Sequence, residues 1–153
     1  MEKKKVHLIE LLPVMEETLK AGGTVKLPIT GTSMLPLLVQ GRDFVLLKKP
    51  DGRCQKFDIP LYRRKDGAFV LHRIIDVQNE TYTMCGDNQW ILEEGIKDSQ
   101  IIGVVTAIER DGKQFSVEDK KYQNYVKRWH RLLPMRKYLV RARGVLHRLE
   151  KDL

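Results

Sequence analysis

Ser33 and His72 are the two residues of this chain best suited to nucleophilic chemistry. Ser33 lies in residues 28–36, Pro-Ile-Thr-Gly-Thr-Ser-Met-Leu-Pro, where a glycine and a proline predict a tight turn. His72 lies in residues 69–75, the apolar run Phe-Val-Leu-His-Arg-Ile-Ile. A serine hydroxyl is a weak nucleophile at neutral pH and needs a base within hydrogen-bond reach. Histidine, with an ordinary pKa of about 6.5, suits that role, so the two segments are what a serine hydrolase requires.

Further short segments follow in a fixed order. The ordered set is Gly-Thr-Ser-Met-Leu-Pro at 31–36, Gly-Arg-Asp at 41–43, Asp-Ile at 58–59, Leu-His-Arg-Ile-Ile at 71–75 and Gly-Asp-Asn at 86–88. Over roughly residues 24–110 this set resembles the boxes of the signal peptidase I superfamily, which also contains the LexA-like self-cleaving repressors. In the typical bacterial enzyme a lysine stands at the position of His72. The histidine form is similar to signal peptidases of the endoplasmic reticulum, archaea and some spore-forming bacteria.

The resemblance implies a role for each residue of a catalytic site. Ser33 would be the nucleophile, and His72 the general base that takes its proton and returns it to the leaving amine. Asp87 is the candidate to orient His72 as the third member of a triad. A second acidic residue of the family is not placed uniquely, because three side chains compete for its position: Glu93, Glu94 and Asp98.

The oxyanion of an acyl-transfer reaction needs hydrogen-bond donors. The backbone amide of Ser33 is the natural one. Some relatives add a serine hydroxyl two residues before the nucleophile, where this chain has Gly31. The oxyanion hole is therefore expected to depend on backbone amides or on Thr32.

Substrate recognition is expected at an exposed strand edge. An extended peptide that adds to such an edge gains affinity from backbone hydrogen bonds, while shallow pockets select its side chains. The resemblance implies small residues before the scissile bond. The residues proposed to bind substrate are Lys26, Leu27, Pro28, Ile29 and Met34.

The pattern of apolar residues predicts a mainly β protein of three parts. A short amphipathic helix occupies residues 6–20 within an N-terminal part, 1–23, and a β-rich peptidase domain follows at 24–118. A basic amphipathic helical tail, 119–153, is expected to be divided at Pro134 and Gly144. With the family resemblance, the expected fold is a signal peptidase/LexA-like coiled β-sheet domain. Its expected strands are 24–29, 43–47, 59–63, 68–77, 81–85, 101–110 and 114–117.

Several classes of protein are excluded by composition. The two cysteines, Cys54 and Cys85, form no disulfide framework and are expected to be reduced structural thiols without a metal. No apolar stretch approaches the roughly 20 residues of a membrane span. Three glutamates interrupt residues 8–19, which therefore do not resemble the apolar core of a signal peptide. We expect a cytoplasmic protein, either free or peripherally attached to a membrane.

The positive charge is concentrated in the tail. Residues 120–153 hold 11 of the 28 Lys and Arg residues and 2 of the 20 Asp and Glu residues, so this segment is +9 and the rest of the chain is −1. Three interpretations are open: a helix on an anionic membrane surface, a solvated helix packed on its own domain or a partner, and phosphate contacts to nucleic acid. We favour the membrane surface over the packed helix, and nucleic acid is the least favoured partner.

The sequence therefore predicts a serine endopeptidase of signal peptidase I type that cleaves a leader or signal-like segment of a precursor through an acyl-enzyme, without metal or organic cofactor. Two alternatives have the same fold. One is a self-cleaving regulator, although the residues before the core are too few for a helix-turn-helix. The other is a non-catalytic peptide-binding module.

Overall fold

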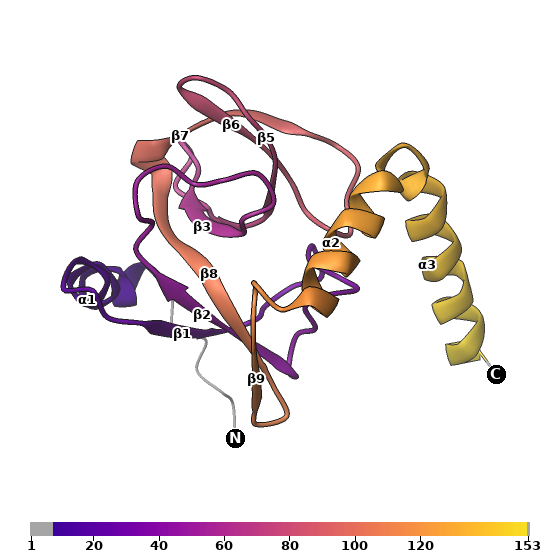
Figure 1. The fold of residues 1–153 in the computed structure, drawn as a ribbon. Coiled ribbons are helices and arrows are strands. Elements are labelled where there is room, and N and C mark those ends of the chain that lie inside the picture. The colour runs from indigo at the N-terminus through magenta and orange to yellow at the C-terminus, as the bar shows by residue number, and fades with distance from the viewer. Residues whose placement is uncertain (1–7, 153) are drawn as a thin grey trace.

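The computed structural model describes residues 8–152 of the chain, so residues 1–7 of the expected N-terminal part lie outside the described residues. The prediction of a mainly β protein with a short N-terminal helix and C-terminal helices is confirmed (Figure 1). In chain order the elements are α1 (Leu8–Lys20), β1 (Val25–Pro28), β2 (Asp43–Lys48), β3 (Pro60–Arg63), β4 (Phe69–Leu71), β5 (Arg73–Val77), β6 (Thr81–Cys85), β7 (Glu93–Lys97), η1 (Asp98–Gln100), β8 (Ile101–Arg110), β9 (Lys113–Ser116), α2 (Lys120–Arg131), η2 (Leu133–Met135) and α3 (Arg136–Asp152).

The strands form two antiparallel sheets. The larger has the order β1-β2-β8-β3-β4, with β9 also paired to β8, and the smaller has the order β5-β6-β7. The long strand β8 runs from beside the small sheet to the β9 hairpin (Figure 1). The register between β8 and its neighbours shifts at Leu46/Leu47 and at Leu61/Tyr62. Such bulges increase local twist and bend, which explains why the larger sheet is curled.

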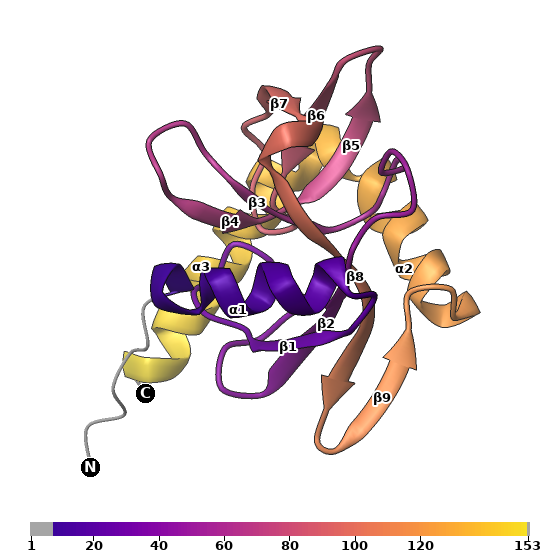
Figure 2. The same ribbon diagram turned by 90° about the vertical axis from the view of Figure 1, so that its left-hand side faces the viewer.

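Two hydrophobic clusters hold the sheets together. The main cluster joins one face of the larger sheet, including Val45 and Leu47, to both α1 and α2. Figure 2 shows α1 lying over β1 and β2, where its buried residues Met15 and Leu19 reach this cluster. The second cluster, around Tyr62, fills the space between β3 and the small sheet. Burying apolar area in this way is the main source of stability, and it fixes α2 against the body of the protein.

The C-terminal segment is a helical hairpin. Asp119 caps α2 by accepting a hydrogen bond from the amide of Lys121 (2.8 Å), and α2 buries Tyr122 and Val126. The chain turns at Pro134, as predicted, and α3 then lies outside the strands (Figure 1). The expected break at Gly144 is wrong, since α3 is continuous through it. An isolated glycine lowers helix stability without ending a helix that has good formers around it.

One other sequence prediction needs correction, and one strand was missed. The expected strand 68–77 is interrupted at His72, where β4 of the larger sheet ends and β5 of the smaller one begins. Strand β7 was not predicted, because its sequence Glu-Glu-Gly-Ile-Lys lacks apolar alternation and buries only Ile96. Its place in the sheet comes from pairing with β6, which local sequence does not encode.

Candidate active site

His72 lies at the junction of the two sheets and faces a cavity. Its side chain is 5% exposed. The cavity has a volume of about 510 Å³, and its walls also include Arg64 after β3, the segment 88–93, and Val140 of α3. The switch from β4 to β5 therefore gives one buried, titratable ring access to a space large enough for a peptide side chain.

The ring nitrogen Nδ1 of His72 has a polar partner that the sequence did not indicate. The hydroxyl of Tyr62 lies 3.4 Å from Nδ1 and donates a hydrogen bond to Glu93 Oε1 at 3.0 Å. Arg64 Nε in turn donates to both carboxylate oxygens of Glu93, at 3.0 and 2.8 Å. Of the three acidic residues that competed as the second acid, Glu93 is thus the one that reaches His72, through a tyrosine.

His72 is held in its neutral form. Burial, and next the charge of Arg64, lower its pKa to about 4, while the charges of Glu93 and Asp87 oppose that shift. A neutral imidazole is the form that can accept a proton.

The depressed pKa of His72 predicts a loss of stability in mild acid. Because the folded protein binds this proton less readily than the unfolded chain, stabilisation is complete above pH 6.5 and is lost as the pH falls towards 4. We expect this residue to account for a loss of about 2–3 kcal/mol between pH 7.5 and 4.5. Urea unfolding at both pH values would measure it as the difference between wild type and His72→Asn. His147→Asn, at an exposed position, is the control and should keep the wild-type pH dependence. Equal pH dependence in wild type and His72→Asn would contradict the prediction.

Ser33 lies half-buried in the turn after β1. Gly31 enters this turn with φ of 75°, in the left-handed region that favours glycine, and its amide donates to Gln40 Oε1 at 2.8 Å. The carbonyl of Ser33 accepts a hydrogen bond from the amide of Asn88 (2.9 Å), and Asn88 lines the His72 cavity. In residues 8–152 the Ser33 hydroxyl makes no hydrogen bond to His72. The structure therefore brings both segments to one loop without joining the two side chains.

Asp43 holds the C-terminal part of the segment that carries Ser33, at residues 37–39. Its buried carboxylate accepts hydrogen bonds from the amide of Val39 (2.8 Å) and from the guanidinium groups of Arg42 and Arg110. Burial alone would raise the pKa of Asp43, but these hydrogen bonds outweigh it and lower the pKa to about 2. Arg110 also donates to the carbonyl of Leu37 at 2.6 Å. The loop that carries Ser33 is thus tied to β2 and β8 at neutral pH.

Gly86 allows the Ser33 turn to approach the Gly-Asp-Asn loop. A Cβ atom at this position would lie 2.6 Å from the carbonyl oxygen of Ser33. We expect Gly86→Ala to push the Ser33 backbone away and lower the free energy of unfolding by about 1–3 kcal/mol, the usual result of overpacking. Chemical denaturation would measure the loss. Gly144→Ala is the matched control, because its Cβ meets open space and α3 should gain stability. An unchanged stability in Gly86→Ala would contradict this packing.

Asp87 has partners other than His72. Its carboxylate accepts two hydrogen bonds from Arg73, at 2.8 and 2.9 Å, and one from the Tyr125 hydroxyl at 2.9 Å. Its carbonyl accepts one from Trp129 Nε1 at 2.7 Å. In the described residues Asp87 makes no direct hydrogen bond to His72, whose Nδ1 contacts Tyr62 instead. Asp87 instead ties α2 to the loop that holds the Ser33 turn.

The remaining competing acids lie elsewhere. Asp98 pairs with Arg53 Nε at 3.2 Å and accepts from the hydroxyl of Tyr82, in the second hydrophobic cluster, and Glu94 is exposed on β7. Neither of these two acids lines the His72 cavity.

The proposed substrate-binding residues divide into two groups. Among residues 8–152, β1 pairs only with β2 and forms one edge of the larger sheet, where Lys26 forms an ion pair with Glu109. Leu27 is half-buried and Pro28 is exposed, while the amide of Ile29, a buried residue, donates to the carbonyl of Asp43. Met34 is 3% exposed and packs in the main core, where its sulfur accepts from the amide of Asp87. The strand edge is therefore present, while the side chain of Met34 is in the protein interior.

The helical hairpin contacts every residue of the loop 86–89. Arg136, 3% exposed, donates to the carbonyls of Gly86 and Gln89, and Arg143 donates to the side chain of Asn88. These helix residues carried no local signal of such a role beyond their charge. The tail is consequently part of the candidate site as well as a basic surface.

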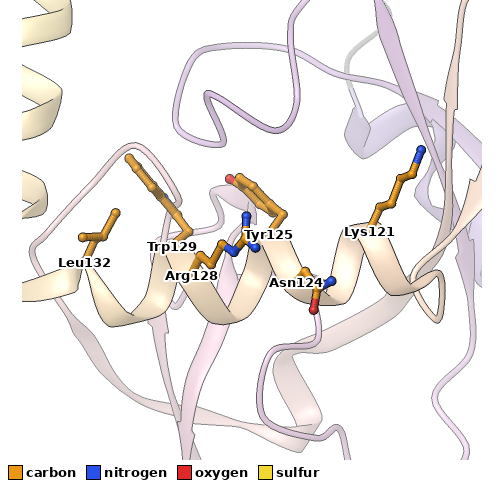
Figure 3. Close-up of a pocket in the computed structure, with 6 residues that line it drawn as sticks. All are labelled: Lys121, Asn124, Tyr125, Arg128, Trp129 and Leu132. Carbon is orange, nitrogen blue, oxygen red and sulfur yellow. The ribbon is translucent and has the colours of Figure 1, made fainter.

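A second hollow, of about 370 Å³, lies along α2 (Figure 3). It is separate from the His72 cavity, but its aromatic residues Tyr125 and Trp129 are the ones that bind Asp87. Its lining combines basic and apolar side chains: Lys121, Asn124, Tyr125, Arg128, Trp129 and Leu132.

Comparison with known proteins gives no match, since no family model, no curated protein and no solved structure matches this chain. None of the helices in residues 8–152 has the length and apolar character needed to span a bilayer. Within the same residues there is no group of three or more His, Cys, Asp or Glu side chains that could hold a metal ion, and both cysteines are free and buried.

Proposed function

We propose that this protein is a serine endopeptidase of signal peptidase I type, with Ser33 as nucleophile and His72 as general base. The observation that carries the proposal is the meeting of the Ser33 turn and the His72 cavity at Asn88, which bonds the Ser33 carbonyl and lines the cavity. We also propose that the curled sheet has the signal peptidase/LexA-like fold implied by the ordered boxes.

The proposed reaction follows the acyl-enzyme route. Neutral His72 takes the Ser33 hydroxyl proton as the oxygen attacks the scissile carbonyl, and then gives that proton to the leaving amine. Water repeats the cycle on the acyl-enzyme and releases the acid product. Catalytic hydrogen bonds are often long in the absence of substrate, so a Ser33 hydroxyl that does not contact His72 within the described part of the chain is compatible with this role. The backbone amide of Ser33 is the proposed oxyanion donor.

The proposed substrate is an extended leader or signal-like segment of a precursor. It would add to the free edge of β1, which leads directly into the Ser33 turn. The His72 cavity would take a substrate side chain against the apolar residues Trp90, Ile91 and Val140.

The proposal is tested with a fluorophosphonate probe and a leader-peptide library, both read by mass spectrometry. We expect the probe to label Ser33 of the wild-type protein, Ser33→Ala to remain unlabelled and His72→Ala to be labelled at least 100-fold more slowly. Peptides cleaved by wild type alone would reveal the residue preference. Labelling of another residue, or equal labelling with and without His72, would refute the Ser33–His72 mechanism.

Two observations favour a second candidate function, a non-catalytic peptide-binding module. Gly31 stands where some relatives carry an oxyanion serine, and the Ser33 hydroxyl is not bonded to His72 in the described residues. Such a module would bind library peptides equally well as wild type and Ser33→Ala, without probe labelling or cleavage.

We further propose that α3 attaches the enzyme to an anionic membrane surface on its cytoplasmic side. Beyond Val140 the helix is largely exposed, with an apolar stripe that faces away from the body. The stripe is formed by Tyr138, Leu139, Val145, Leu146 and Leu149, each at least 40% exposed. Lys137, Arg141 and Arg148 follow one border of the stripe at helical spacing. Apolar side chains beside cations suit the headgroup region of anionic lipids.

Membrane attachment predicts a specific effect of Leu146→Glu. This change places a charge on the stripe, and we expect binding to vesicles of phosphatidylcholine with phosphatidylglycerol to weaken about tenfold, a difference of about 1.4 kcal/mol. Cosedimentation measures it. Gln114→Glu on β9 adds the same charge away from α3 and should bind as wild type does. Absence of vesicle binding, or dimerisation through the stripe, would contradict the attachment.

A further inference from the structure

The hydrogen bonds around Tyr62 determine where its proton lies. Tyr62 is fully buried, and its hydroxyl is 3.0 Å from Glu93 Oε1 and 3.4 Å from His72 Nδ1. An ionised carboxylate can only accept hydrogen bonds, so between these two neighbours the hydroxyl donates its proton to Glu93. The hydroxyl oxygen then has only lone pairs to offer to His72.

Glu93 is held in the ionised state that this arrangement requires. Burial alone would raise its pKa, but the hydrogen bonds from Arg64 and Tyr62 outweigh burial and keep the pKa below its ordinary value. Burial and the neighbouring charge of Glu93 raise the pKa of Tyr62, which therefore keeps its proton. Both groups have fixed protonation states around neutral pH.

These states define the tautomer of His72. A neutral imidazole carries one N–H, and the nitrogen that faces an acceptor must be the one that carries it. We propose that Tyr62 and Glu93 are positioning residues that fix His72 in its Nδ1–H form and leave the lone pair of Nε2 free to act as the base. This inference deepens the proposed function and rests on it for the role of Nε2.

The same chain of groups favours the charged ring formed during the reaction. When Nε2 takes a proton, the imidazolium donates through Nδ1 to Tyr62, and the negative charge of Glu93 lies behind that hydroxyl. The other charged groups that act on His72 are Arg64, which opposes the positive ring, and Asp87, which favours it. The Tyr62 ring also meets His72 edge to face, with centroids 6.3 Å apart, which restricts rotation of the imidazole. A tyrosine and a glutamate thus share the work that one aspartate does in a Ser-His-Asp triad.

The test is nitrogen-15 NMR of the His72 ring at pH 7, in the full chain and without substrate. We expect Nδ1–H in wild type. In Glu93→Ala the Tyr62 proton is free to turn towards Nδ1, so we expect the tautomer to change to Nε2–H. Tyr62→Phe removes the hydroxyl that faces Nδ1, so no neighbouring group favours one tautomer of His72 and both should appear. Glu94→Ala, an exposed neighbour on the same strand, is the matched control and should keep Nδ1–H.

This readout is independent of peptidase activity. Nε2–H in wild type, or an unchanged tautomer in both Glu93→Ala and Tyr62→Phe, would overturn the inference. If wild type shows Nδ1–H but is not labelled by the probe and cleaves no peptide, the positioning of His72 by Tyr62 and Glu93 would stand and the proposed peptidase activity would be refuted. If cleavage is present, Tyr62→Phe should lower kcat about 10- to 100-fold with KM unchanged, part of the 10²–10⁴ that general-base catalysis contributes.

Discussion

Asp87→Asn is expected to lower the free energy of unfolding by about 3–5 kcal/mol, because it leaves a buried guanidinium without its counter-charge. Arg73 and Asp87 are 4% and 1% exposed, and two hydrogen bonds of 2.8 and 2.9 Å join them. Arg73 also donates to the carbonyl of Phe57 and to the hydroxyl of Tyr122, so it cannot swing out to solvent without breaking contacts to α2. Without the carboxylate, the buried Arg73 guanidinium therefore keeps the full desolvation cost with no counter-charge to offset it.

Chemical denaturation measures this loss, and a surface pair provides the control. Glu109→Gln removes the partner of Lys26 from an ion pair whose side chains are 27% and 48% exposed. Exposed pairs contribute about 0–1 kcal/mol, so this variant should unfold nearly as wild type does. Equal effects of the two variants would mean that the Arg73–Asp87 pair is not buried in solution.

The buried pair also explains why the helical hairpin belongs to the site. Asp87 is held from one side by Arg73, which follows His72 directly, and from the other by Tyr125 and Trp129 of α2. A change in the position of α2 would therefore move the loop that bonds the Ser33 carbonyl. If α3 lies on a membrane as proposed, α3, α2 and the loop 86–89 would link that membrane surface to the turn that carries Ser33.

Local sequence was a good guide to strands bounded by turns. Lys-Asp-Gly at 65–67 and Asp-Gly at 111–112 separate strands that the sequence predicted, and the structure pairs β3 with β4 and β8 with β9 across these turns. Turn residues encode these features locally. The break at His72 and the strand β7 could not be found in this way, because both depend on pairing with distant segments.

The candidate site shows the same limit. The motifs singled out Ser33, His72 and Asp87, and the structure gathers their segments around the loop 86–88. The partners were not predictable: Tyr62 reads as an ordinary strand aromatic, and Tyr125 lies 38 residues beyond Asp87. Side-chain hydrogen bonds between distant elements depend on the packed fold, which a single sequence does not display. Sequence could only name Glu93 as one of three acids, and the geometry distinguishes it.

The second large effect is expected on catalysis. Ser33→Ala and His72→Ala should each lower kcat for a cleaved leader peptide by at least about 10⁴-fold, or about 5.5 kcal/mol of transition-state stabilisation, since the proposed nucleophile and base would act as one unit. For the same reason the double variant should be no slower than either single one by more than a few-fold. Stability should change little in Ser33→Ala, because no hydrogen bond joins its hydroxyl to His72 in the described residues. Single-turnover assays by mass spectrometry measure the rates.

Thr30→Ala is the control for these rates, because it removes an exposed hydroxyl from the same segment, three residues before Ser33. It should cleave at the wild-type rate. Additive losses in the double variant would show that the two residues act separately, as they would if His72 only shaped the cavity. Equal cleavage by all variants would assign the activity to another group. Non-additive losses are therefore a sharper test than the single variants alone. Losses that come from destabilisation are expected to add in the double variant, whereas losses from a coupled catalytic pair are not.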